Sequence, residues 1–67
     1  MTHKTITLKY DDFIFKIEED SPQVGVYLYV YQNGKCIKDC LQDTIDDCKK
    51  IALEEFNVPI TKWSQAQ

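Results

Sequence analysis

Residues 24–39, VGVYLYVYQNGKCIKD, carry the strongest fold signal in this chain. Valine and tyrosine alternate as far as Tyr31, which is the period of two expected for a strand with one buried face. Asn33-Gly34 then supplies the pair most typical of a tight β-hairpin, because both residues tolerate the positive φ that the turn needs. The sequence therefore predicts a strand over 24–31, a turn at Asn33-Gly34 and a returning strand over 35–39.

This turn also predicts which residues of the hairpin lie opposite one another. Residues that are equally far from the turn centre face each other on neighbouring strands. The expected pairs are Tyr31 with Cys36, Val30 with Ile37, and Tyr29 with Lys38. Ile37 would then face the core together with Val30, whereas the tyrosines would face away from it.

The residues before this stretch form a second alternating pattern. Thr5–Tyr10 and Phe13–Glu18 each have an apolar side chain at every second position, and Asp11-Asp12 separates them as a two-residue turn. The pairs expected across it are Tyr10 with Phe13, Leu8 with Phe15, and Ile6 with Ile17. These six side chains fall on one face of the sheet. The second hairpin would add Val26, Leu28, Val30 and Ile37 to this apolar face. The polar residues 19–23, which include Ser21-Pro22, are expected to form a loop.

After the strands, the apolar period changes to that of a helix. The stripe consists of Leu41, Ile45, Cys48, Ala52 and Phe56, at spacings of three and four residues. Asp43 or Thr44 can cap its start, and Asn57 can cap its end before Pro59. We therefore expect one small α+β domain over 1–67. Its elements would follow the order β-β-β-β-α along the chain. They would form a four-stranded, mainly antiparallel sheet with one C-terminal helix packed on one face, followed by a tail over 58–67.

The length and charge of the chain argue against several classes of function. A domain of 67 residues has little room for an enclosed enzyme pocket or a cofactor. Eight basic and 11 acidic residues give a net charge of −3, which disfavours a nucleic-acid backbone as partner. No apolar run reaches the length of a membrane span. We expect a protein that is not an enzyme, holds no cofactor and binds neither nucleic acid nor membrane.

The three cysteines, an odd number with no signal peptide before them, indicate a reducing, cytoplasmic environment. Cys36, Cys40 and Cys48 together with His3 lack the spacing of a zinc site, so we expect no metal centre. Cys48 lies on the apolar helix stripe, where a thiol is usually inert, and a Cys48–His3 pair would lack both an oxyanion donor and an orienting third residue. The acidic residues over 18–20 and 39–47 are interpreted as solvated or helix-capping.

One helix covers only one face of the sheet, so the opposite face needs an explanation of its own. Three of the four tyrosines form a stripe on it. We expect a protein interface there, made by Ile14, Tyr27, Tyr29, Tyr31, Cys36 and Trp63. Stacking of nucleic-acid bases would need a basic surround, and the chain has no arginine. The other alternative is that tyrosine is only a good strand former here, and that the tail with Trp63 folds over part of this face.

Two resemblances to known families bear on the function. The segments VYLYVYQNGKC (26–36), LQDTI (41–45) and ALEEFNVP (52–59), with Trp63, resemble a set of short bacterial proteins that have no assigned activity or site residues. The helix start at 43–47, DTIDD, following several strands, is similar to that of HicB-type antitoxins, whose domains have a strand-strand-strand-helix order. The glycine-rich strand and the separate DNA-binding segment of that family are missing here.

The two functions that follow belong to different classes. The open sheet face favours a non-enzymatic protein-interaction module that self-associates as a homodimer or binds another protein. The antitoxin resemblance, together with the acidic charge, implies the alternative of an antitoxin-like or regulatory inhibitor that binds a basic protein partner.

Overall fold

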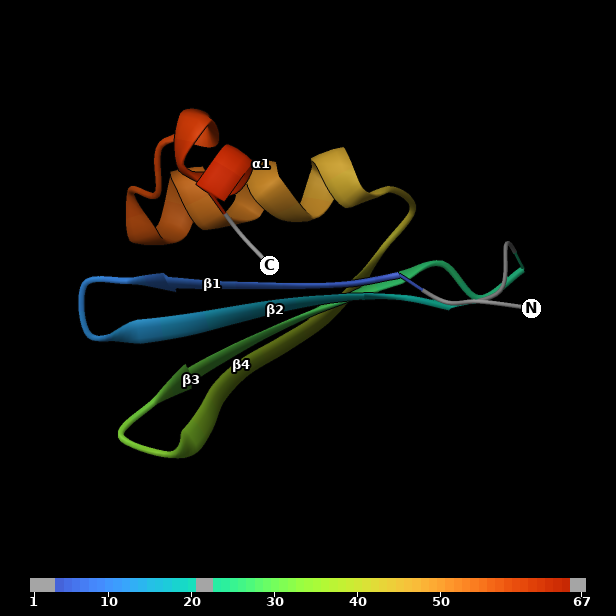
Figure 1. The fold of residues 1–67 in the computed structure, drawn as a ribbon. Helices are drawn as coiled ribbons and strands as arrows, with labels where there is room; N and C mark the ends of the chain where they lie inside the picture. Colours follow the sequence, from blue (N-terminus) through green and yellow to red (C-terminus); the bar gives the residue numbers. More distant parts are fainter. Residues whose placement is uncertain (1–3, 21–22, 66–67) are drawn as a thin grey trace.

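The computed structural model describes residues 4–20 and 23–65. Its elements are β1 (Thr5–Tyr10), β2 (Phe13–Glu19), β3 (Val26–Gln32), β4 (Lys35–Gln42), α1 (Ile45–Phe56) and the short 3₁₀ helix η1 (Ile60–Gln65). The strands form one antiparallel sheet in the order β1-β2-β3-β4, and α1 lies across one side of it (Figure 1). The α+β class and the β-β-β-β-α order expected from the sequence are confirmed. Ser21-Pro22 of the expected loop lies outside the described residues.

The first hairpin has the register that its alternation predicts. The structure pairs Tyr10 with Phe13, Leu8 with Phe15, and Ile6 with Ile17. The turn at Asp11-Asp12 places Asp11 at a φ of 59°, a left-handed conformation that aspartate tolerates better than most residues. Because one face of this hairpin is buried, a slip of one residue would expose every apolar side chain on it.

The second hairpin departs from its expected register one pair beyond the turn. Asn33 and Gly34 both have positive φ, and Tyr31 pairs with Cys36 as predicted. The register then shifts, so that Val30 lies opposite Lys38 and not Ile37. The predicted pairs Val30–Ile37 and Tyr29–Lys38 are therefore wrong.

The shift has a physical reason in the residues that follow it. With no bulge, Asp39 would lie opposite Leu28 and face the core. The extra residue puts Cys40 opposite Leu28 instead and turns Asp39 to the other face, opposite Tyr29. Ile37 is left 47% exposed at the bulge, so it does not extend the apolar face as expected.

Gly25 allows β4 to continue alongside the start of β3. Its φ is +113°, and a Cβ placed on it would lie 2.5 Å from the main-chain oxygen of Gln42. Only glycine fits both the conformation and this approach. Gln42 therefore still pairs with Val26, and β4 runs further than the predicted strand over 35–39.

The helix begins and ends at the expected caps. Thr44 is the N-cap, and the Asp47 backbone N–H donates to its Oγ1 over 3.1 Å. Asn57 ends α1 in the left-handed conformation, at a φ of 59°. Cys48 and Ala52 are the buried residues of the helix. Leu41 belongs to β4, not to the helical stripe in which the spacing had placed it.

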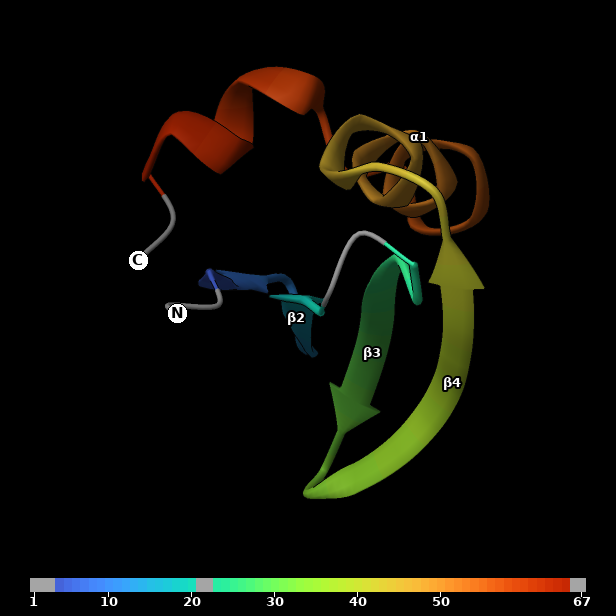
Figure 2. The ribbon, with the colours of Figure 1, turned by 90° about the vertical axis from the view of Figure 1, so that its right-hand side faces the viewer.

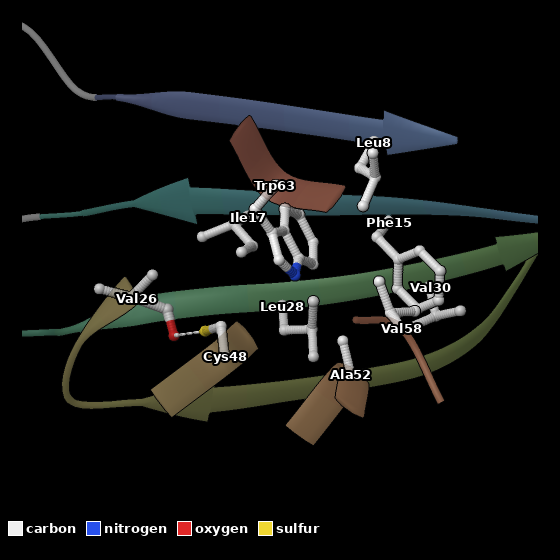
Figure 3. Close-up of a cluster of buried hydrophobic side chains, with 10 residues drawn as sticks. All are labelled: Leu8, Phe15, Ile17, Val26, Leu28, Val30, Cys48, Ala52, Val58 and Trp63. Carbon is white, nitrogen blue, oxygen red and sulfur yellow. Dashed lines mark hydrogen bonds between the residues drawn. The ribbon is translucent and has the colours of Figure 1, made fainter. Parts of the chain in front are cut away.

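The core lies between the sheet and the two helical segments, which pack against each other on the same side of the sheet (Figure 2). Figure 3 shows its ten buried side chains, which include the indole of Trp63. Phe15 is fully buried and stands edge-on to the Trp63 and Phe56 rings, at centroid distances of 6.1 and 5.4 Å. Trp63 is only 5% exposed, so the tail packs into this core.

Candidate functional site

The side of the sheet away from the helices is the candidate functional surface, and we call it the tyrosine face. In Figures 1 and 2, α1 and η1 both lie on the other side. The strand register assigns twelve positions to the tyrosine face. They are Thr5, Thr7 and Lys9 of β1; Ile14, Lys16 and Glu18 of β2; Tyr27, Tyr29 and Tyr31 of β3; and Cys36, Asp39 and Leu41 of β4.

The three tyrosines form a continuous row of rings along β3. Tyr27 and Tyr29 are stacked, with ring centroids 5.8 Å apart and planes 14° apart. Tyr31 continues the row at 6.4 Å from Tyr29, tilted by 32°. This is the spacing that every second residue of a strand imposes, and all three side chains remain half-exposed. The row is a wide, semi-rigid aromatic surface.

Two aliphatic side chains flank this row on opposite sides. Ile14 of β2 lies opposite Tyr31 and is 43% exposed, and Leu41 of β4 lies opposite Tyr27 and is 48% exposed. Leu41 was not predicted to lie on this face, because its spacing also fits the helical stripe. Asp39 is the residue that could have indicated the bulge, and with it the position of Leu41. In a strand without a bulge, the Asp39 carboxylate would point toward the core.

The charges of the face lie beside the middle tyrosine. Lys16 and Asp39 are the two cross-strand neighbours of Tyr29, one on each side. Lys16 Nζ also lies 3.4 Å from Glu18 Oε2, in an ion pair exposed to solvent. Partial desolvation, followed by the negative charge of Glu18 and smaller contributions that include Asp39, raises the pKa of Tyr29 above its ordinary value.

Five of the six residues expected at an interface lie on this face, and one does not. Ile14, Tyr27, Tyr29, Tyr31 and Cys36 are brought together. Trp63 lies in the core on the opposite side, because η1 packs against α1 and β1. Both ideas that placed it on the tyrosine face, as an interface residue or as a cover, are therefore wrong. Its Nε1 is buried without a hydrogen-bond partner among the described residues.

The three cysteines differ in how far they are buried: Cys36 is exposed, Cys40 is intermediate and Cys48 is buried. Cys36, Cys40 and Cys48 are free thiols, and no group of three metal-ligating residues occurs over 4–20 and 23–65. His3 lies outside these ranges. Burial of Cys48, with minor contributions from Cys40 and Asp47, raises the pKa of its thiol to about 12. Its Sγ is 3.8 Å from the Val26 carbonyl oxygen, so it is held as a neutral donor (Figure 3).

This thiol should make the protein less stable at alkaline pH. Its ordinary pKa is 9.0, so the unfolded thiol loses its proton well before the folded one. Between about pH 9 and 12 the unfolded state therefore binds fewer protons, and the free energy of unfolding falls as the pH rises. Below about pH 9 the Cys48 thiol is protonated in both the folded and the unfolded state, so it no longer makes the free energy of unfolding depend on pH.

Urea unfolding of the wild type and of Cys48→Ala over this range isolates the contribution. The other groups that titrate there, such as Tyr29 and Lys38, are present in both proteins and cancel in the difference. The free energy of unfolding of the wild type should fall more steeply, by up to about 1.4 kcal/mol per pH unit. Equal slopes would show that the Cys48 thiol ionises freely in the folded chain.

Comparisons with known proteins do not assign this chain to a family. The chain matches no protein-family model, no curated protein and no solved structure at a significant level. Over the described residues, no helix combines the length and the apolar character needed to cross a membrane.

Proposed function

We propose that this protein is a non-enzymatic interaction module that self-associates through the tyrosine face. The observation that carries the proposal is the half-exposed row of Tyr27, Tyr29 and Tyr31 between the exposed Ile14 and Leu41. Contiguous apolar patches of this kind are uncommon on monomers, and tyrosine offers a large contact area with little rotamer entropy to lose. The free thiols fit a cytoplasmic protein, whose compartment keeps cysteines reduced.

The charges near the tyrosine row support a protein partner over a nucleic acid. Lys9 and Lys16 share the face with Glu18 and Asp39, so its basic and acidic side chains balance. A surface that follows a phosphate backbone needs a basic excess beside its aromatic rings. A self-associating face needs both signs, because each copy must supply the partner of the other's charges.

The alternative, an antitoxin-like or regulatory inhibitor of a basic protein, has less support. It rests on the net charge of −3. On α1, however, the four acidic residues are accompanied by Lys49 and Lys50, and Glu55 is already paired with Lys38 of β4, so part of the acidic charge of the described helix is compensated within the chain. Self-association is the function that the surface supports better.

Replacement of the central tyrosine tests the proposal. Tyr29→Lys places an ammonium group between Lys16 and Asp39; Asp39 compensates it within one chain, so the fold should be kept. At the centre of an interface between two copies the same group would be desolvated, and we expect dimer dissociation to be favoured at least about tenfold. Sedimentation velocity from micromolar to millimolar concentration measures the association of both proteins.

A matched control separates the tyrosine face from the rest of the surface. Leu53 is 40% exposed on α1, on the other side of the sheet, so Leu53→Lys makes a similar change away from the proposed interface. This variant should associate as the wild type does. A wild type that stays monomeric at about millimolar concentration would refute self-association.

A further inference from the structure

The register arranges the tyrosine face as three rows that cross the sheet at right angles to its strands. The middle row is Lys16 of β2, Tyr29 of β3 and Asp39 of β4. One outer row is Ile14, Tyr31 and Cys36, and the other is Glu18, Tyr27 and Leu41. In the middle row, the central tyrosine thus separates a positive side chain on β2 from a negative one on β4.

We infer that two copies pack tyrosine face against tyrosine face about a two-fold axis that runs along β3. Such a rotation places each row over the same row of the second copy but exchanges its two ends, so β2 of one copy lies over β4 of the second. Lys16 then meets Asp39 of the second copy, and the symmetry makes this contact twice. In one outer row, Ile14 meets Cys36 of the second copy, an apolar side chain against a thiol. In the other, Glu18, which pairs with Lys16 of its own chain, meets Leu41 of the second copy. This inference rests on the self-association proposed above.

The other simple two-fold arrangement is unfavourable because of the same charges. An axis that runs across the strands, through Tyr29, would place each strand over the same strand of the second copy. Lys16 would then meet Lys16, and Asp39 would meet Asp39, which gives two like-charge contacts in an interface that excludes water. An axis along β3 gives opposite charges at both places.

The size of the face suits a reversible dimer. In this arrangement β1 lies outside the contact, and the three strands β2–β4 over seven residues measure about 14 Å by 23 Å at ordinary strand spacing and rise. Two such faces together bury roughly 650 Å², below the range of stable specific interfaces and in that of weak, transient contacts. Two aligned sheets would pack face to face at about 10 Å, with their strands rotated by about 30° because each sheet is twisted. We therefore expect a weak dimer, with a dissociation constant between micromolar and millimolar.

Charge reversal tests this arrangement directly. Lys16→Glu would place the new carboxylate against Asp39 of the second copy, and Asp39→Lys would place two ammonium groups together. Each variant alone should dissociate at least about tenfold more readily than the wild type. An equimolar mixture of the two should recover wild-type association, because in the mixed dimer each new charge faces an opposite one. Sedimentation velocity of each protein and of the mixture gives the dissociation constants.

Net charge alone cannot produce this pattern. Lys16→Glu makes the net charge of −3 more negative, whereas Asp39→Lys makes it less negative, so general repulsion would weaken one dimer and strengthen the other. Lys9→Glu is the matched control for the first change. Lys9 lies on the same face, but β1 would project beyond β4 of the second copy, so this variant should associate as the wild type does.

The outcomes separate the arrangement from self-association itself. A monomeric wild type overturns both. A wild-type dimer that neither reversal weakens, or a mixture no better than its components, overturns the axis along β3 and leaves self-association standing. Loss of the fold is monitored by circular dichroism, and a charge-reversed pair in one chain, Lys16→Glu with Asp39→Lys, should regain the dimer.

Discussion

Ala52→Asp is expected to leave most of the protein unfolded in water. Ala52 is fully buried where α1 packs on the sheet, in the same cluster as Leu28 and Val30. A carboxylate there has no described partner and must be desolvated or protonated. We expect a loss of about 3–5 kcal/mol in the free energy of unfolding, which is comparable to the whole stability of a domain this small. Urea unfolding followed by circular dichroism measures the loss.

The next residue along the helix provides the control for this substitution. Leu53 is 40% exposed, and Leu53→Asp introduces the same helix-disfavouring residue on the outer side of α1. It should cost about 1 kcal/mol or less, since it removes only part of an apolar contact and buries no charge. Similar urea midpoints for the two variants would mean that α1 presents a different side to the sheet.

The fold was predictable wherever one local pattern decided the structure. In the first hairpin, the period of two and the short turn leave a single register that buries Leu8 and Phe15, and the structure has that register. The helix caps were predictable for the same reason. A threonine hydroxyl that accepts from a backbone N–H and a left-handed asparagine each act within one helical turn.

The second hairpin shows where such local patterns fail. Asn33-Gly34 defines the turn, but the turn cannot anticipate that Asp39 must be kept out of the core. The bulge that does so also moves Leu41 onto the tyrosine face and directs Lys38 to the helix side. Lys38 Nζ there pairs with Glu55 Oε1 at 2.9 Å, and this hydrogen bond raises the pKa of Lys38. These consequences depend on packing between elements, and no single strand pattern encodes them.

The tyrosine row of the candidate surface was therefore predicted from the sequence, whereas its neighbours on β4 were not. The tyrosine row follows from the alternation within β3 alone, whereas the neighbours of Tyr29 depend on the bulge. The expected Lys38 would have put positive charge on both sides of Tyr29, beside Lys16. The observed Asp39 gives one charge of each sign beside Tyr29, and the proposed face-to-face dimer depends on this change.

Trp63→Ala should destabilise the protein nearly as much as Ala52→Asp, because the tail is part of the core. From sequence, nothing local says which side of the sheet a tail beyond Pro59 will cover. The structure shows that η1 turns back over β1 beside α1, which brings the indole against Phe15 at a centroid distance of 6.1 Å. Truncation of a buried aromatic side chain typically costs about 3–5 kcal/mol, and urea unfolding followed by circular dichroism measures it.

The chemistry of the indole supplies the control for this last substitution. Because Nε1 of Trp63 is buried without a described hydrogen-bond partner, Trp63→Phe removes an unsatisfied donor while it keeps most of the ring contact. Its cost should be less than half that of Trp63→Ala. If both variants were as stable as the wild type, the tail would contribute nothing to the core. A Trp63→Ala protein that folds normally but no longer dimerises would return Trp63 to the interface, against its burial beneath η1.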